Sequence, residues 1–427
     1  MKRNKITTGL GIVIVGLMAA TGCSSDAEGG EDTQEDVSLR FAWWGSDTRH
    51  QATQEIIDLF EEENPGITVE AQFGEWSNYW DQIATQTAGG NAPDIIQMDE
   101  MYVREYADRN ALLDLSDVDT SELEDAAVDA GRTEDGLYAI SLGVIALGTI
   151  VNADLLDEAG IDMPDDESWT WDDFAEISAQ VSSDLDGVYG AGELVGAPMG
   201  LQVWLRQHDK DLFDDSGELA LSTDDARDYL QFTLDLHEDA DYPSADYISE
   251  SQGLGPEDSA VGTNEAAMGF RWATQVIAQT SASGSDLQVL RLPSEEGSAE
   301  ANGDWIKGSM FLSAAAGTDH PEEAKQFIDF FVNSQEAGEI NGMERGLPAN
   351  LEIRQSVLEE IEGPELAAAE FVEEVEQSGA GTTPVPPPGF GTFQEIIDRH
   401  LLELLFDRMT VDEAAEGMVA ELEAEVS

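Results

Sequence analysis

The sequence predicts an α/β protein built from two lobes. The first observation is the alternation of strand-like and helix-like segments over residues 39–99, which forms half of an α/β domain. The second is the apolar, glycine-punctuated stretch at residues 136–156, which is too long for one strand and carries no helix cap. We expect two strands there, with the chain crossing between lobes around residues 143–148. Two lobes joined in this way predict a ligand cleft between them.

Residues 39–99 contain the expected strands 39–44, 67–73 and 94–98 and the expected helices 47–63 and 77–88. Ligands of open α/β sheets bind beyond the carboxyl ends of the strands. Trp43 and Trp44 end the first strand, and alternation along Leu39 and Phe41 places Trp43 on the apolar face. We therefore expect Trp44 to face the ligand.

The later elements follow from helix caps and breakers. Thr170 predicts the start of a helix, because a threonine before an acidic first turn is a common cap. Further helices are expected at residues 222–239, 272–280, 321–333, 351–361, 364–377 and 393–406. Further strands are expected at residues 264–271, 287–292 and 307–315, and no repeat of 20–50 residues is present.

The first 22 residues have the pattern of a secretory signal peptide, with a basic start and an apolar run too short to span a membrane. Cys23 is the one cysteine of the chain, and its position after small residues resembles a bacterial lipobox. That resemblance implies cleavage before Cys23 and lipidation of its sulfur, whereas the alternative is an ordinary signal with an incidental cysteine. Residues 23–36 then read as an acidic, flexible tether on the outer face of the cell membrane.

The chain is extremely acidic, with 90 acidic and 19 basic residues among 427. Three of the bases lie in the first 22 residues, so the remainder carries 90 acids against 16 bases, a net charge near −74. This charge repels nucleic acid and anionic membranes and disfavours such partners. We interpret it as adaptation to a saline or acidic environment rather than as a specific cation site. A hydrophobic fraction of 41% still indicates a globular chain, and its length suggests two domains.

Catalytic signals are poor. The five histidines show no metal-ligand spacing, and neither a nucleophile elbow nor a phosphate-binding loop is present. Carboxylates are so abundant that no glycosidase pair stands out. The acidic loop 184–193 lacks the spacing of a calcium loop, so we interpret it as a solvated turn. We expect no cofactor, no metal and no enzyme activity.

The nine tryptophans give a better signal, because several stand in loops beside glycine and charge: "WWGSD", "GEWSNYW", "GFRWAT" and "NGDWIKGS". A sugar suits such a setting, since its C–H face stacks on an indole and its hydroxyls bond to charged groups. We expect Trp80, Trp169 and Trp204 in the core. Trp44, Trp272 and Trp305 flank predicted strand ends and are expected at the site.

The chain resembles the extracellular solute-binding proteins of bacterial ABC importers, in the carbohydrate-binding group that includes maltose- and oligosaccharide-binding proteins. The matching stretches span nearly all of the mature chain in the family's order; among them are "TQTAGGNAPDIIQMD", "SWTWDDFAEI", "NEAAMGFRWA" and "HPEEAKQFIDFFVNSQEAGEINGMERGLPAN". The resemblance implies a periplasmic-binding-protein-like fold, with two lobes that close over a ligand. It also implies a monomer that delivers a sugar to permease subunits in the membrane.

The resemblance carries ligand contacts onto the loops of this chain that match the family's cleft loops. The implied ligand-binding residues are Trp44, Asp47, Arg49, Trp76, Met98, Asp99, Arg271, Trp272, Trp305, Lys307 and Phe390. Met98 departs from the family, because maltose-type members often carry an aromatic there, so the ligand need not be maltose. Four bases, Arg49, Arg271, Lys307 and Arg345, lie in matched cleft loops and suggest an acidic sugar such as a uronide, unless they make structural ion pairs.

The sequence therefore predicts a sugar-binding lipoprotein of an ABC importer. We expect a first lobe from residues 37–145 with 301–345 and a second from residues 146–300 with 346–427. Two alternatives remain at this stage: a secreted lipoprotein enzyme acting on polysaccharide, and an adhesive or structural lipoprotein.

Overall fold

The structure is a computed structural model that describes residues 36–133, 135–192, 198–214, 218–378 and 385–426. The expected signal peptide, Cys23 and nearly all of the acidic tether lie outside the described residues, as does the end of the loop 184–193. Within the described part of the chain, we find no helix with the length and apolar character needed to cross a membrane.

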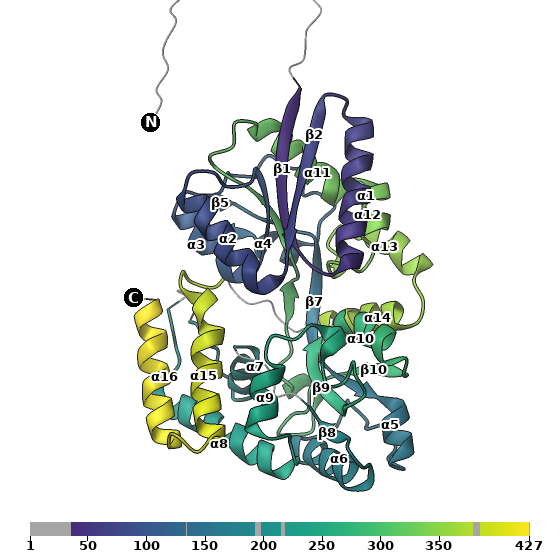
Figure 1. The fold of residues 1–427 in the computed structure, drawn as a ribbon, viewed down its shortest axis with the longest axis vertical. Coiled ribbons are helices and arrows are strands. Elements are labelled where there is room, and N and C mark those ends of the chain that lie inside the picture. The colour runs from purple at the N-terminus through teal and green to yellow at the C-terminus, as the bar shows by residue number, and fades with distance from the viewer. Residues whose placement is uncertain (1–35, 134, 193–197, 215–217, 379–384, 427) are drawn as a thin grey trace, which may run out of the picture. The chain divides into compact units, whose positions relative to one another are not determined.

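The first sheet contains five strands in the order β2-β1-β3-β12-β6. Its strands are β1 (Val37–Trp44), β2 (Ile67–Gly74), β3 (Ile95–Met98), β6 (Ile140–Ser141) and β12 (Phe311–Ala314). β1 pairs in parallel with β2 and β3, and β12 pairs antiparallel with β3 and β6. β1 and β2 run side by side, so their carboxyl ends meet at one edge of the sheet (Figure 1).

Helices cover both faces of this sheet, which is why every residue of its central strands β3 and β12 is buried. They are α1 (Asp47–Glu63), α2 (Trp76–Ala88), α3 (Glu100–Asp108), α4 (Asp125–Asp129), α11 (Pro321–Asn333), α12 (Gln335–Asn341) and α13 (Leu351–Glu360), beside a small hairpin of β4 (Arg132–Thr133) and β5 (Gly136–Leu137). α1 starts where Ser46 caps it, and its apolar side packs Phe60 edge-on against Phe327 of α11. The predicted bounds of α1 and α11 are confirmed.

The strand β7 (Gly143–Asn152) connects the two halves of the fold, and all ten of its residues are buried. Near its start it pairs with β11 (Ile306–Gly308) and β13 (Leu347–Pro348). Further along it pairs with β9 (Ala266–Trp272) and β10 (Leu287–Leu290), and β8 (Tyr189–Ala191) pairs with β9. The stretch 136–156 therefore contains one long continuous strand where the crossing was expected, preceded by the short β5 and β6.

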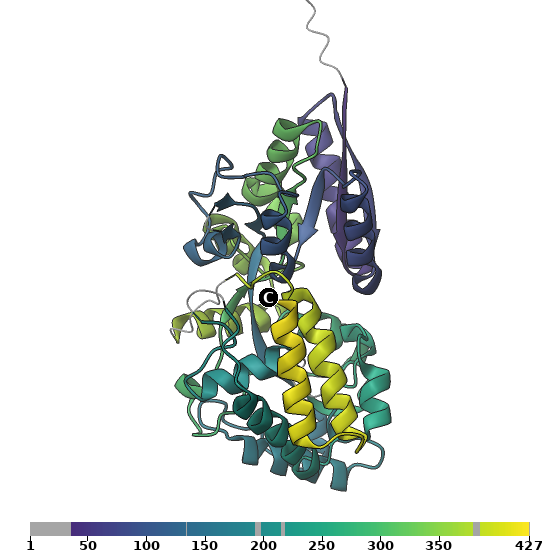
Figure 2. The same cartoon turned by 90° about the vertical axis from the view of Figure 1, so that its left-hand side faces the viewer.

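The second sheet is surrounded by the remaining helices, which Figure 1 shows below β7. They are α5 (Ala153–Glu158), α6 (Trp171–Asp184), α7 (Met199–Gln207), α8 (Thr223–Asp239), α9 (Ala245–Ser251), α10 (Gln275–Ser283), α14 (Pro364–Gln377), α15 (Phe393–Leu405) and α16 (Val411–Glu425), with single turns η1 (Pro256–Asp258), η2 (Ala299–Ala301) and η3 (Phe390–Thr392). α15 and α16 lie side by side in both views and share a core with α8 (Figure 2). Thr170 caps α6 as predicted, in a capping box with Asp173.

Two predicted elements need correction. The helix expected at residues 272–280 begins only at Gln275, because Trp272 is the last residue of β9 and pairs with Leu147 of β7. The single strand expected at residues 307–315 is divided: β11 pairs with β7, and β12 belongs to the first sheet. A chain segment that leaves one sheet for the other cannot keep one uninterrupted ladder, and the sequence alone gave no sign of the change.

Candidate functional site

Five aromatic side chains gather beyond the carboxyl ends of β1 and β3, and we call them the aromatic cluster: Trp44, Trp76, Tyr79, Trp80 and Tyr102. The ring centroid of Trp44 lies 5.0 Å from that of Trp76, 5.2 Å from Tyr79 and 5.6 Å from Trp80. The ring centroids of Trp80 and Tyr102 lie 3.9 Å apart. The Tyr79 hydroxyl donates to the carbonyl of Gln97 at 2.7 Å and ties α2 to β3.

Trp44 and Trp76 differ in how much of each ring solvent can reach. Trp44 is 7% exposed, because α2 covers it, whereas Trp76 at the start of that helix is 38% exposed. Trp43 is fully buried, as the alternation predicted. Of the two adjacent indoles, neither is therefore open to solvent, and Trp76 supplies the accessible indole face of the aromatic cluster.

A second group, the charged cluster, brings together Asp99, Glu100, Trp272, Trp305 and Lys307. The Lys307 ammonium lies 3.0 Å from Glu100 Oε1 and 3.4 Å from Asp99 Oδ2. It also lies 5.4 Å from the ring centroid of Trp272, whose ring meets Trp305 edge-on at 6.1 Å. The start of α3 and the end of β9 thus converge on one lysine of β11. Burial disfavours the charge of Lys307, but the two carboxylates outweigh it and raise its pKa.

The two clusters meet at the first turn of α3. Asp99 caps this helix by accepting a hydrogen bond from the Met101 amide, Glu100 follows, and Tyr102 belongs to the aromatic cluster. Gly391 of η3 also closes against Tyr102, since a Cβ at that position would lie 2.3 Å from its ring. Rings, carboxylates and an ammonium group therefore share one region of the molecule, as sugar recognition requires.

Besides Trp44, three apolar residues of the predicted site have buried side chains. Met98 is fully buried within β3, and Trp305 is 2% exposed. Phe390 is buried against Phe213 and Phe393, in the core shared by α8, α15 and α16. Trp169 and Trp204 are buried as expected, whereas Trp80 is only partly buried.

The basic residues singled out in the sequence have interaction partners within the protein. Arg49 donates to the carbonyl of Glu344 at 2.6 Å and lies 3.7 Å from its carboxylate. Arg345 is fully buried and donates to Gln97, Asn341 and Thr53 at 2.8–2.9 Å. Arg271 is half-buried on β9 beside Trp272, and Asp47 lies exposed at the start of α1. The alternative considered from the sequence, that these bases make structural ion pairs, accordingly holds for Arg49 and Lys307. Arg345 instead makes hydrogen bonds within the core.

Sequence reasoning missed one buried carboxyl beside the charged cluster. Asp304 precedes Trp305, and burial raises its pKa to about 8. Its Oδ2 accepts from the Asn302 amide at 2.6 Å, while Oδ1 has no hydrogen-bond partner among the described residues. The Arg206 guanidinium lies 5.3 Å from the Trp305 ring centroid. The turn "NGD" before Trp305 was the only sequence signal for this group.

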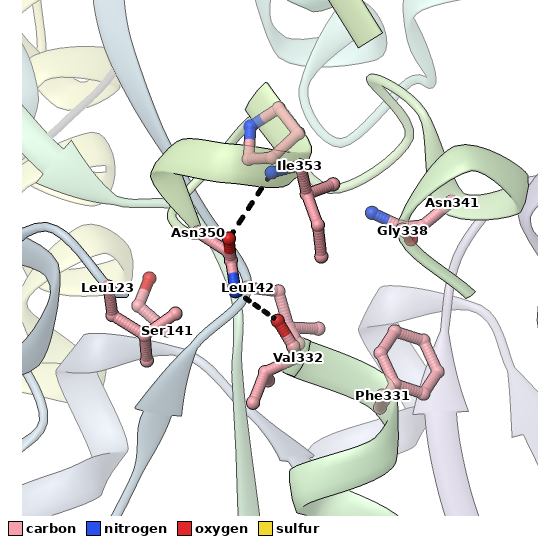
Figure 3. A pocket seen from close by; sticks show the side chains of 10 residues that line it. Leu123, Ser141, Leu142, Phe331, Val332, Gly338, Asn341, Asn350 and Ile353 are labelled. Atoms are coloured by element: carbon pink, nitrogen blue, oxygen red, sulfur yellow. Dashed lines mark hydrogen bonds between the residues drawn. The ribbon is translucent and has the colours of Figure 1, made fainter. Parts of the chain in front are cut away.

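Two cavities among the described residues are much smaller than a sugar. One lies between α11, α12, α13 and the strands β6 and β13, where Asn350 bonds to the carbonyl of Val332 and to the amide of Ile353 (Figure 3). The other lies between α6, α7 and α8. Each encloses about 20 Å³, which is room for about one water molecule. Across the described residues, no group of three or more His, Cys, Asp and Glu side chains is arranged to hold a metal ion.

The chain belongs to the bacterial extracellular solute-binding proteins, whose family model matches residues 44–338. It is 23% identical over 354 residues to YcjN of Escherichia coli K12, a protein named as an ABC transporter periplasmic-binding protein, with 79% of each chain covered. The chain is therefore an ABC-type extracellular solute-binding protein.

Two solved structures share its fold. The first, an oligogalacturonide-binding protein of Yersinia enterocolitica in complex with saturated digalacturonic acid, has a TM-score of 0.79 at 21% identity and covers 92% of this chain and 100% of its own. The second, an ABC substrate-binding protein of Listeria monocytogenes in complex with cycloalternan, has a TM-score of 0.78 at 22% identity, with 91% and 99% covered. The predicted two-lobed α/β fold is thereby confirmed.

Proposed function

We propose that this protein captures a sugar or oligosaccharide and delivers it to the permease of an ABC importer without altering it. The observation that carries the proposal is the meeting of the aromatic and charged clusters at the first turn of α3. An exposed indole binds the apolar face of a sugar ring, and buried carboxylates accept hydrogen bonds from its hydroxyls. The family and its sugar-bound structural neighbours support the same conclusion.

The sequence-based boundaries, residues 37–145 with 301–345 for one lobe and residues 146–300 with 346–427 for the other, need one change within this proposal. α13 packs against α11 and α12 beside the first sheet, so it would belong to the first lobe. The two lobes would be joined through β7 and its partner strands. Closure of two lobes excludes water from the ligand and creates the surface that a permease recognises. We further propose that lipidated Cys23 and the acidic tether hold the folded body at the outer face of the membrane, as a monomer.

A neutral sugar suits the site better than a uronide. Lys307 already faces Asp99 and Glu100, and Arg49 faces Glu344, so their charges are compensated within the protein. A ligand carboxylate would have to replace one of these partners and would leave a buried carboxylate unpaired, which is costly.

A panel of neutral and acidic sugars tests the proposal by thermal shift and tryptophan fluorescence. A ligand at 100 times its dissociation constant should stabilise the protein by about 2.7 kcal/mol. We expect Trp76→Ala and Trp272→Ala to weaken binding about tenfold, consistent with the loss of one aromatic contact. Trp204→Phe, which changes a buried indole that belongs to neither cluster, should bind like the parent protein.

The outcomes separate the proposal from its competitors. Binding of an intact sugar with no product over hours supports a transport receptor. Release of shorter sugars from polysaccharide would instead indicate the enzyme considered above. Absence of any sugar-dependent shift across the whole panel would refute the proposal and favour an adhesive or structural role.

A further inference from the structure

An exposed phenylalanine lies on the face of the first sheet opposite the aromatic cluster, beside Trp43. Phe73 lies near the end of the edge strand β2 and is 57% exposed, more than the other exposed large apolar side chains, Trp76, Leu254 and Leu351. It pairs in register with Trp43, whose ring centroid is 5.3 Å away. Its ring also lies 4.2 Å from the His50 imidazole, with 33° between the planes. A large apolar ring is thus fixed in place but left open to solvent.

The hydrogen bonding of His50 fixes which nitrogen carries its proton. The Trp43 indole donates from Nε1 to His50 Nδ1 at 3.0 Å, so Nδ1 must accept. A neutral imidazole that accepts at Nδ1 carries its hydrogen on Nε2. Burial also lowers the pKa of His50, which keeps the ring neutral. None of the described residues accepts from Nε2, so an N–H donor remains available beside the Phe73 face.

Carboxylates complete the surroundings of this donor. Asp47 in the first turn of α1 and Glu75 before α2 both lie close enough to act electrostatically on His50, and both are exposed. An open ring face, a fixed N–H donor and two carboxylate acceptors are the groups that bind an uncharged sugar unit. The same carboxylates would repel a uronide at this position.

We propose that Phe73, His50, Asp47 and Glu75 form an outer subsite for one neutral unit of an oligosaccharide. This inference rests on the proposed sugar-binding function and deepens it, because it makes the ligand a chain of several sugar units. The subsite and the aromatic cluster lie on opposite faces of the same sheet edge, joined through the adjacent residues Trp43 and Trp44. A ligand that lies across the carboxyl ends of β1 and β2 contacts both.

The test measures affinity against ligand length by isothermal titration calorimetry. The probes are arabino-oligosaccharides and malto-oligosaccharides of one to five units, with trigalacturonic acid as the charged probe. We expect affinity to rise with length in at least one neutral series. Phe73→Ala should weaken the tetra- and pentasaccharide about tenfold and reduce the advantage of long over short ligands.

Two variants of His50 test whether its N–H donor, and not only the packing of its ring, contributes to ligand affinity. His50→Gln keeps an N–H group near the place of Nε2, whereas His50→Asn keeps only an acceptor near the place of Nδ1. We expect His50→Asn to lose affinity for long ligands and His50→Gln to retain most of it. Leu351→Ala, which removes another exposed apolar side chain, serves as the matched control and should leave the length series unchanged.

The results distinguish this inference from the function on which it rests. If sugars bind but affinity is independent of length, or if Phe73→Ala changes long-ligand affinity by less than twofold, the subsite is refuted while the sugar receptor stands. Tighter binding of trigalacturonic acid than of neutral trisaccharides would also refute it. If no sugar of any series binds, both proposals fall together.

Discussion

Arg345 carries a positive charge that is fully buried in the core, where its guanidinium donates hydrogen bonds to three neutral acceptors. Gln97, one of these acceptors, donates in turn to the carbonyl of Trp44 at 3.2 Å. This arrangement couples the core to the end of β1. Since burial disfavours the charge and lowers the pKa of Arg345, the hydrogen bonds are what keep the group in place.

Replacing Arg345 should therefore destabilise the fold strongly. Arg345→Ala leaves three buried acceptors without a donor, and we expect it to lower the unfolding free energy by about 3 kcal/mol in urea denaturation. Arg345→Lys should recover only part of this, because an ammonium group lacks the planar fork. Arg227→Ala removes a partly exposed arginine that pairs with the exposed Asp412 and should change stability little. An Arg345→Ala protein as stable as the parent would contradict this assignment.

His50 should make stability depend on pH. Its pKa is lowered in the folded protein, mainly by burial, with Arg49 and Arg345 adding to the effect and Asp47 and Glu75 opposing it. The unfolded chain then binds more protons near the ordinary histidine pKa of about 6.5. The stabilisation that follows from the lowered pKa of His50 is complete above about pH 6.5 and is lost as the pH falls below this value. We expect the difference in unfolding free energy between wild type and His50→Gln to shrink as the pH is lowered from 7.5 to 5. A difference that stays constant over this range would contradict a role of His50 in the pH dependence.

At the residue scale, the sequence could predict which face a side chain takes but not what covers it. Trp43 is buried because the period of a strand put it on the apolar face. Trp44 is also covered, by rings of α2 that lie more than 30 positions later in the chain. His50 and Phe73 were missed for the same reason, since their contact joins two separate elements across the end of a strand.

At the scale of elements, helix caps gave the most reliable information. Proline in the first turn marked α11 and α14, and both have the predicted bounds. Thr170 and Asp173 form a reciprocal capping box at α6. Strand exchange between sheets was not predictable in this way. Residues 307–315 read as one strand with small residues, and only the tertiary pairing divides them between β7 and β3.

The capping box of α6 provides a test with a matched control. Thr170→Ala removes an acceptor for the Asp173 amide, and we expect a loss of about 1 kcal/mol in the unfolding free energy. Thr274 occupies the same position before α10 but makes no capping hydrogen bond from its side chain. Thr274→Ala should therefore cost much less in the same urea titration. Equal losses in the two variants would mean that the box contributes no specific stabilisation.

At the scale of the whole molecule, repulsion among carboxylates opposes folding. The chain carries 90 acidic residues against 19 basic ones, so most carboxylates have no cation of the protein to pair with. Many of the basic residues that do form pairs are themselves engaged in the core or the site, as Lys307 and Arg354 are. Compaction brings the unpaired charges closer together, which favours the expanded chain at low ionic strength.

Salt should therefore stabilise this protein. Raising NaCl from about 0.1 M to 1 M shortens the screening length from about 10 Å to about 3 Å, so repulsion between neighbouring exposed carboxylates falls sharply. The exposed ion pairs also weaken, but each contributes at most about 1 kcal/mol and they are few beside the unpaired acids. We expect the melting temperature to rise steeply up to about 0.5 M NaCl and then to level off as screening is completed. Sucrose, which stabilises by exclusion from the surface without screening charge, should give a gradual increase with no such plateau. A melting temperature that falls with NaCl would mean that the ion pairs outweigh the repulsion, and the acidic surface would then need another explanation.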